Sequence, residues 1–245
     1  MLFVRSLTFF AGQCAATLVF APLALLTFPL PYRMRYRFIT QWSRFNLWWL
    51  KRTCRLHYCV TGRDRIPASN AIILCKHQSA WETIALARIF PPQVWVIKRE
   101  LLWIPFFGWG LAMLEPIAID RKGGRRAVRQ LVEAGCKRLA LGRWVVVFPE
   151  GTRVAPGHRR RYGIGGGVLA AHSGYPVVPV AHNAGEFWPR RGFLKYPGTI
   201  QVVIGPPISS GGRSPEQITA AAEAWIEATM DEIGAGAPAD TGAAR

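Results

Sequence analysis

An imidazole and a carboxylate stand five residues apart in the segment 76–82, which reads Lys-His-Gln-Ser-Ala-Trp-Glu. The segment follows an apolar run and precedes a helical pattern, and loops at strand ends are where open α/β sheets bind ligands. On one helix, His77 and Glu82 would point about 140° apart. If His77 lies in the loop and Glu82 in the first helical turn, the two side chains can meet. The carboxylate would then fix the imidazole tautomer and leave its other nitrogen as a general base.

The same segment also has structural interpretations. Ser79 and Glu82 have the spacing of a capping box, in which the glutamate closes the first turn of a helix. Cys75 lies two residues before His77, which suggests a thiol–imidazole pair, but its place in an apolar run favours a core cysteine. Taken alone, the segment leaves a catalytic and a structural role open for Glu82.

A second polar turn follows the apolar run 144–148, where the segment 148–153 reads Phe-Pro-Glu-Gly-Thr-Arg. Gly151 would let a ligand approach the backbone, and Thr152 and Arg153 offer hydrogen bonds and a fixed charge to a phosphate. The structural alternative is a simple strand-ending turn with Glu150 and Arg153 as a solvated ion pair.

Two further segments complete the set. Ile-Asp-Arg at 119–121 ends another apolar run, and the guanidinium of Arg121 suits bidentate phosphate binding. The basic residues of 122–126 beyond it fit a solvated or lipid-facing patch. Tyr-Pro-Val-Val-Pro-Val at 175–180 is apolar and predicts a core strand that shapes the site.

These segments need a sheet that brings strand ends together. Short apolar runs rich in β-branched residues alternate with helical patterns, which indicates an α/β domain with a mainly parallel central sheet flanked by helices. We predict strands at 56–60, 71–75, 94–98, 116–119, 144–148, 177–181 and 199–204, and helices at 81–89, 106–113, 125–141, 165–172 and 215–233. Ser214, Pro215 and Gln217 form a capping box at the start of the last helix.

The N-terminus is strongly apolar. No charged residue occurs from Ser6 to Tyr32, and a bilayer core needs about 20 apolar residues in a helix. Pro22 and Pro29 predict a kink or an early stop. The run exceeds the apolar part of a cleaved signal peptide, whereas a hairpin that only enters the bilayer stays open as an alternative.

The next stretch predicts an amphipathic helix. Phe38, Trp42, Phe45 and Trp49 would share one stripe, and the basic residues Arg33, Arg37, Arg44, Lys51 and Arg55 would share another. This pattern favours a helix at the membrane surface with its rings in lipid, over a helix packed on the domain core. The positive-inside rule then predicts the inner membrane, with the globular domain facing the cytoplasm.

Composition agrees with this organisation. The 245 residues carry a formal net charge of +17, which attracts polyanions such as an anionic membrane surface, nucleic acid or phosphorylated substrates. Aromatic residues interleaved with the cations favour the membrane over nucleic acid. The five cysteines have no metal or redox spacing and predict reduced, structural thiols. We expect a membrane anchor at 1–55, an α/β domain at 56–233 and a disordered tail at 234–245.

The order of the four segments resembles the 1-acyl-sn-glycerol-3-phosphate (lysophosphatidic acid) acyltransferase family of bacterial type. It covers the stretch 71–180 by motif, and 98–101 and 104–108 resemble the family's segment between the first two motifs. Four ordered motifs are far more specific than one. The commonest acid of the first motif in the family is aspartate, so Glu82 departs from it by one methylene.

The resemblance implies a glycerolipid acyltransferase fold and direct acyl transfer from acyl-CoA or acyl carrier protein to a lysophospholipid hydroxyl. His77 would be the base and Glu82 its partner. The acceptor would be bound by residues of the other motifs. Its phosphate would contact Arg121, Gly151, Thr152 and Arg153. Lys98 would lie near the phosphate or the oxyanion, and Glu150 would contact a glycerol hydroxyl. No metal or cofactor is expected, because a thioester is already activated.

Two rival functions remain at this point. Another lysolipid, such as a lysophosphocholine or an aminolipid, could be the acceptor, since the motifs specify the reaction more than the head group. A non-catalytic binder of anionic lipid or nucleic acid would explain the charge, but it leaves the paired segments 76–82 and 148–153 without a reason to occur together at strand ends.

Overall fold

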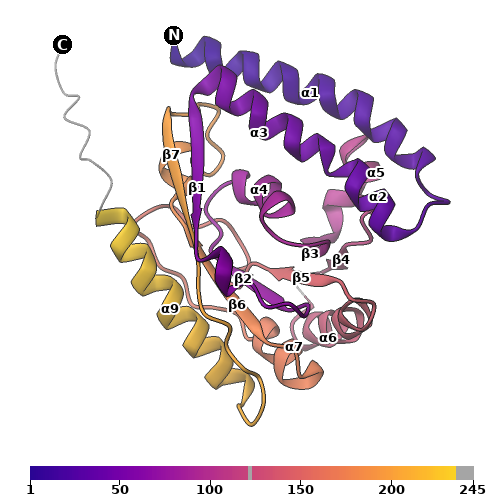
Figure 1. Cartoon of the computed structure of the whole chain (residues 1–245), viewed down its shortest axis with the longest axis vertical. Helices are drawn as coiled ribbons and strands as arrows, with labels where there is room; N and C mark the ends of the chain where they lie inside the picture. The colour runs from indigo at the N-terminus through magenta and orange to yellow at the C-terminus, as the bar shows by residue number, and fades with distance from the viewer. Residues whose placement is uncertain (121–122, 236–245) are drawn as a thin grey trace.

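The computed structural model describes residues 1–120 and 123–235, and within them a seven-stranded sheet forms the centre of the molecule (Figure 1). The strands lie in the order β1-β7-β6-β2-β5-β3-β4, and every neighbouring pair is parallel except β6 and β7. Their bounds are β1 Leu56–Thr61, β2 Ile72–Cys75, β3 Gln93–Lys98, β4 Ile117–Ile119, β5 Trp144–Val147, β6 Val177–His182 and β7 Gly198–Ile204. The predicted fold class is confirmed, with a mainly parallel sheet.

Helices cover both faces of this sheet, as a parallel sheet requires. They are α4 Trp81–Ile89, α5 Phe107–Ala112, α6 Arg125–Ala140, α7 Gly165–Ser173, α8 Ala184–Phe187 and α9 Pro215–Ala235, with short 3-10 turns η1 Arg63–Arg65 and η2 Arg99–Trp103. Ile73 packs in the core cluster that includes α4, whereas Ile72 and Leu74 pack in the cluster that includes α6, α7 and α9. Successive side chains of a strand point to opposite faces of the sheet, so β2 contributes to a separate core on each face.

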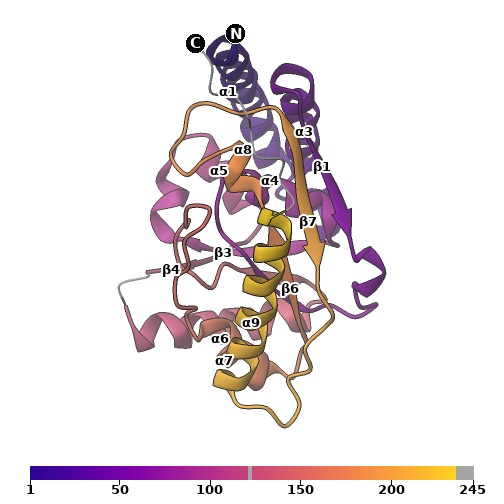
Figure 2. The same cartoon turned by 90° about the vertical axis from the view of Figure 1, so that its left-hand side faces the viewer.

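The last helix begins where the sequence predicts. The Ser214 amide donates to Gln217 Oε1 at 2.9 Å, and the Gln217 amide donates to Ser214 Oγ at 3.3 Å. This reciprocal pair is the predicted capping box, and it fixes the start of α9. Figure 2 shows α9 running alongside β6, on the side of the sheet that also carries α7.

The apolar N-terminus is one helix, α1 Leu2–Leu26, which continues through Pro22. The helix therefore does not stop at Pro22, and it ends three residues before Pro29, where the second proline predicts a stop. It is long and apolar enough to cross a membrane, and 22% of its most apolar 18-residue window is buried inside the protein. Most of its surface is therefore exposed and apolar, unlike that of a core helix in a soluble protein.

The predicted amphipathic helix is divided into α2 Tyr32–Ile39 and α3 Gln41–Cys54. α3 lies beside α1 (Figures 1 and 2). Trp42 Nε1 donates to Thr17 Oγ1 and Trp49 Nε1 donates to the Thr8 carbonyl, each at 3.1 Å. Two of the four predicted lipid-facing rings thus pack on α1, because a buried indole needs both apolar contact and an acceptor for its N–H.

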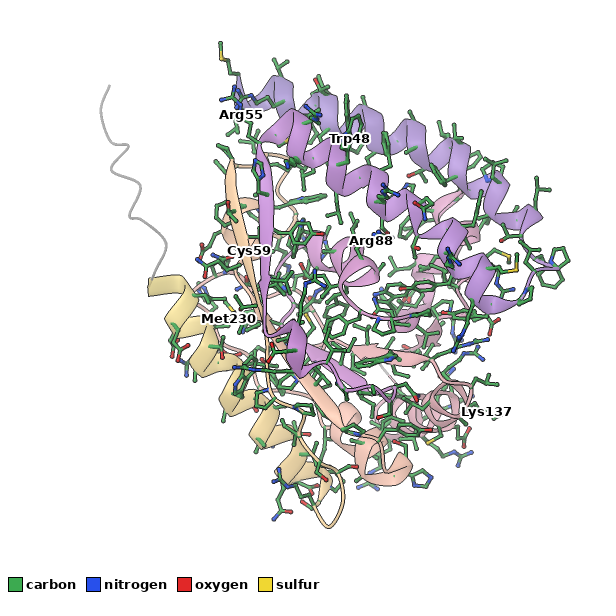
Figure 3. The ribbon with its side chains drawn as sticks, viewed as in Figure 1. Trp48, Arg55, Cys59, Arg88, Lys137 and Met230 are labelled. Carbon is green, nitrogen blue, oxygen red and sulfur yellow. The ribbon has the colours of Figure 1, made fainter. Side chains whose placement is uncertain are left out.

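The predicted basic stripe is exposed, as expected for a surface helix. All five of its cations are exposed, and Trp48, at 49% exposure, is the large ring of α3 that faces outward among them. In Figure 3, Trp48 lies near the middle of this helix and Arg55 directly follows its end. The exposed surface of α3 therefore carries one tryptophan among cations, and the other rings of the helix are partly buried.

Candidate active site

The site lies at the carboxyl ends of β2 and β5, which are neighbours in the sheet. His77 follows β2 in the loop, and Glu82 lies in the first turn of α4. His77 Nδ1 is 2.8 Å from Glu82 Oε1, and both residues are buried, with 8% and 0% exposure. The loop-plus-helix arrangement predicted from the spacing therefore brings the imidazole and the carboxylate into contact.

Glu82 also closes the start of α4. Its carboxylate accepts hydrogen bonds from the Gln78 amide at 3.0 Å and from the Ser79 amide at 2.9 Å. Burial would raise the pKa of Glu82, but His182, the hydrogen bond to His77 and the Ser79 amide outweigh it and lower that pKa. The capping and the catalytic interpretations of Glu82 are thus compatible, because one ionised carboxylate does both.

The ionised Glu82 fixes the tautomer of His77. A carboxylate only accepts hydrogen bonds, so Nδ1 carries the proton that lies between them. Nε2 is then left with a lone pair, and among the described residues no hydrogen bond reaches it. This is the state in which an imidazole can take a proton from an alcohol.

The segment 148–153 supports the His77 loop from the neighbouring strand. The Phe148 ring stacks on the His77 ring with centroids 4.1 Å apart and planes at 20°. The His77 amide donates to Glu150 Oε2 at 2.6 Å, and the Val154 amide donates to the His77 carbonyl at 2.8 Å. Both peptide groups and the ring of His77 are therefore held by one turn.

Glu150 has a different environment from the one predicted. It is 3% exposed, and its Oε1 lies 2.9 Å from Lys76 Nζ while Oε2 accepts from His77. Burial raises the pKa of Glu150, against the opposing effects of Lys76 and the His77 amide. Both carboxylate oxygens have partners inside the protein, and the predicted contact with a glycerol hydroxyl stays a prediction. The solvated pair with Arg153 is excluded.

The remaining predicted residues lie on the turn after β5 or at the end of its neighbour β3, with Arg121 as the exception. Gly151 is exposed with φ +69°, a left-handed conformation that favours glycine, and Thr152 and Arg153 after it are half-buried. Lys98 ends β3, the other neighbour of β5, and its half-exposed side chain lies 3.0 Å from Glu100. Arg121 lies outside the described residues.

Sequence reasoning missed two buried residues. His182, at the end of β6, lies with Nε2 2.8 Å from the Lys76 carbonyl and 3.9 Å from Glu82 Oε2. Burial lowers the pKa of His182, against the opposing effect of Glu82, and its Nδ1 accepts from the Ala184 amide. Lys76 is 1% exposed. The only signal for either was a polar residue in or next to an apolar run.

Cys75 behaves as the core cysteine that the sequence favours. It is fully buried in β2, and burial, with Glu82 and Glu150 nearby, raises the pKa of its thiol well above the ordinary value. A thiolate is the nucleophilic form, so this environment disfavours covalent catalysis by Cys75. The geometry instead supports proton transfer at His77.

Comparison with known proteins agrees with this geometry. The family model described as Acyltransferase matches residues 57–183. The 1-acyl-sn-glycerol-3-phosphate acyltransferase of Pseudomonas aeruginosa is 46% identical over 94% of this chain and 91% of that protein. The human 1-acyl-sn-glycerol-3-phosphate acyltransferase alpha is 29% identical over 67% of this chain and 59% of that protein.

A solved structure shows the same fold. The crystal structure of the 1-acyl-sn-glycerophosphate acyltransferase from Thermotoga maritima superposes with a TM-score of 0.79 over 96% of both chains, at 22% identity. The matched stretch 57–183 contains both the His77–Glu82 pair and the turn that supports it. This chain belongs to the bacterial-type 1-acyl-sn-glycerol-3-phosphate acyltransferase family and is an O-acyltransferase of phospholipid biosynthesis.

Proposed function

We propose that this enzyme transfers an acyl group from the thioester of acyl-CoA or acyl carrier protein to the sn-2 hydroxyl of 1-acyl-sn-glycerol-3-phosphate, which gives phosphatidic acid. The observation that carries the proposal is the buried His77–Glu82 pair, which is seated beside the 148–153 turn at the carboxyl edge of the sheet. The names of the bacterial and human relatives support the same acceptor.

In this mechanism His77 is the general base. Nε2 removes the proton from the sn-2 hydroxyl while the hydroxyl oxygen attacks the thioester carbonyl carbon. A carbon–oxygen bond forms, the carbon–sulfur bond of the tetrahedral intermediate then breaks, and the thiol leaves with the proton returned by His77. Glu82 stabilises the imidazolium between these two proton transfers. The activated thioester supplies the driving force, so no metal or cofactor takes part.

The acceptor phosphate would be bound by the cations around His77. Thr152 and Arg153 end the 148–153 turn after β5, Lys98 ends the neighbouring strand β3, and Arg121 is the remaining cation that the sequence assigns to the phosphate. Guanidinium groups bind phosphate in a bidentate way, which also fixes its orientation. The free sn-2 hydroxyl then has one consistent position relative to His77.

The acceptor and product have long acyl chains, so the enzyme would work at a membrane. We infer that α1 lies in one leaflet of the inner membrane rather than across the bilayer, because one of its faces packs on α3 and α5. Its other face exposes large apolar side chains, including Phe10, Leu18 and Leu26. The exposed cations of α3 would contact anionic head groups at the cytoplasmic surface.

The test is the product formed by the wild-type enzyme in detergent micelles. 1-acyl-sn-glycerol-3-phosphate is offered with acyl-CoA or acyl carrier protein as donor, and lysophosphatidylcholine and an aminolipid serve as competing acceptors. Phosphatidic acid as the main product would support the proposal and identify the donor. Preferential acylation of another lysolipid would replace the acceptor, and no transfer by folded protein with either donor would exclude the proposed reaction.

Arg153→Ala is expected to raise KM for lysophosphatidate by about tenfold or more, because a charge-assisted bond to phosphate is worth about 1.5–3 kcal/mol. KM for acyl-CoA should change by less than about twofold, and initial rates at varied acceptor concentration measure both values. Arg129→Ala is the matched control, since its side chain on α6 is 84% exposed. An unchanged KM for lysophosphatidate in Arg153→Ala would remove Arg153 from the phosphate site.

A further inference from the structure

The lysine next to the proposed base is buried among carboxylates. Lys76 follows β2 directly, and its side chain is 1% exposed. Its Nζ lies 2.9 Å from Glu150 Oε1 and 2.7 Å from Glu227 Oε1. A buried ammonium is unfavourable unless it is paired, so these two contacts determine where the side chain can lie.

The two carboxylates come from different parts of the fold. Glu150 belongs to the turn after β5, and Glu227 lies on α9, 151 residues from Lys76 in the sequence. The Tyr162 hydroxyl donates to Glu227 Oε1 at 2.9 Å, and Arg159 lies 3.6 Å from the other oxygen of Glu227. Arg159 also pairs with Asp231 at the exposed edge of this group, so the buried part consists of one ammonium between two carboxylates.

This group is connected to His77 through Glu150. Glu150 uses one oxygen for Lys76 and the other for the His77 amide, at 2.6 Å. The neighbouring Val154 amide holds the His77 carbonyl. A shift of the Glu150 carboxylate would therefore move the peptide group of the proposed base.

We infer that Lys76 and Glu227 are positioning residues for acyl transfer: they hold Glu150 where its second oxygen fixes the peptide group of His77. The inference rests on the proposed function, because it concerns the base of that reaction. It gives the C-terminal helix α9 a direct part in the geometry of the site, although α9 lies outside the matched stretch 57–183. A misplacement of about 1 Å can cost about 100-fold in rate, so a small displacement of this loop is measurable.

The charges of Lys76 and Glu227 shift the pKa of Glu150 in opposite directions, which gives a second test of the inference. The titratable groups around Glu150 are Cys75, Lys76, Tyr162 and Glu227, besides His77 itself. Burial raises the pKa of Glu150, Lys76 lowers it, and Glu227 raises it. Loss of the Lys76 charge should therefore raise this pKa, and loss of the Glu227 charge should lower it.

The test compares Lys76→Met and Glu227→Gln with wild type. We expect kcat to fall about tenfold or more in Lys76→Met and less in Glu227→Gln, with KM for both substrates within about twofold, since a tenfold change corresponds to about 1.4 kcal/mol. A protonated Glu150 accepts the His77 amide more weakly. The acidic limb of the kcat profile should therefore move to higher pH in Lys76→Met and to lower pH in Glu227→Gln.

A readout independent of activity separates this inference from the proposed reaction. Diethyl pyrocarbonate labelling of His77, followed by peptide mass spectrometry, should be several times faster in Lys76→Met, because the displaced imidazole is less buried. Labelling can be compared even if wild type transfers no acyl group. If Lys76→Met does not fold, Glu227→Gln decides, since glutamine keeps the size of the side chain and an acceptor for Lys76.

The control is Asp231→Asn, an exposed carboxylate one turn further along α9 that pairs with Arg159. It should match wild type in kcat, pH profile and labelling. The inference is wrong if folded Lys76→Met and Glu227→Gln keep the wild-type values of all three. Equal effects in Asp231→Asn would also overturn it, because any charge on that part of α9 would then suffice.

Discussion

His77→Ala should reduce kcat/KM for phosphatidic acid formation by about 10²- to 10⁴-fold, the usual contribution of a general base. The substitution removes the only ring whose free nitrogen faces no hydrogen-bond partner among the described residues of the site. The fold should persist, because Glu82 keeps its bonds to the Gln78 and Ser79 amides. Initial rates with labelled acyl donor measure the loss.

The comparison needs a histidine that the mechanism does not use. His172 is exposed on α7, and His172→Ala should leave the rate within about twofold of wild type. Circular dichroism and the unfolding temperature would show that His77→Ala is folded. A folded His77→Ala enzyme with at least a tenth of the wild-type rate would exclude His77 as the base and leave its pairing with Glu82 a structural feature.

The sequence predicted the sheet well because each buried strand is a short apolar run that ends in a polar motif. The His77–Glu82 contact was predictable for the same reason: β2 ends two residues before His77, and α4 begins one residue before Glu82. Local spacing decides such a contact. No long-range information was required, and the capping alternative turned out to describe the same carboxylate.

Contacts between distant segments could not be predicted in this way. Lys76 and Glu227 are 151 residues apart, and His182 reaches the site only because β6 pairs with β2. The substrate role of Glu150 came from the family resemblance, and the sequence could not show that its carboxylate pairs with the buried Lys76. Trp42 and Trp49 were assigned to lipid, because the sequence cannot show that the chain turns back after α1 and packs α3 against it.

Glu82→Gln is the second substitution with a large expected effect, a loss of about 10² to 10⁴ in kcat with the fold retained. Glutamine has the size of glutamate and keeps an oxygen for the Gln78 and Ser79 amides. It cannot stabilise the imidazolium, and its amide nitrogen can donate to His77 Nδ1. The ring would then carry its proton on Nε2, which is the wrong tautomer for a base.

Stability provides an independent check on the charge of Glu82. Its pKa lies below the ordinary value of 4.5, because His182, His77 and the Ser79 amide outweigh burial. A carboxyl group with a lowered pKa stabilises the folded state above its ordinary pKa, and this stabilisation is lost as the pH falls through the folded value. The unfolding temperature of Glu82→Gln should therefore lie below that of wild type at pH 7, and the difference should shrink under acidic conditions.

Glu82→Asp separates charge from reach in this pair. Aspartate keeps the negative charge but is one methylene shorter, so it should recover more of the rate than glutamine does while the His77 contact lengthens. Glu133→Gln, an exposed carboxylate on α6, should behave like wild type. If Glu82→Gln and Glu82→Asp were equally impaired, the length of the side chain, and not its negative charge alone, would determine the rate. If both retained the wild-type rate, Glu82 would only cap α4, and His77 would act without a carboxylate partner.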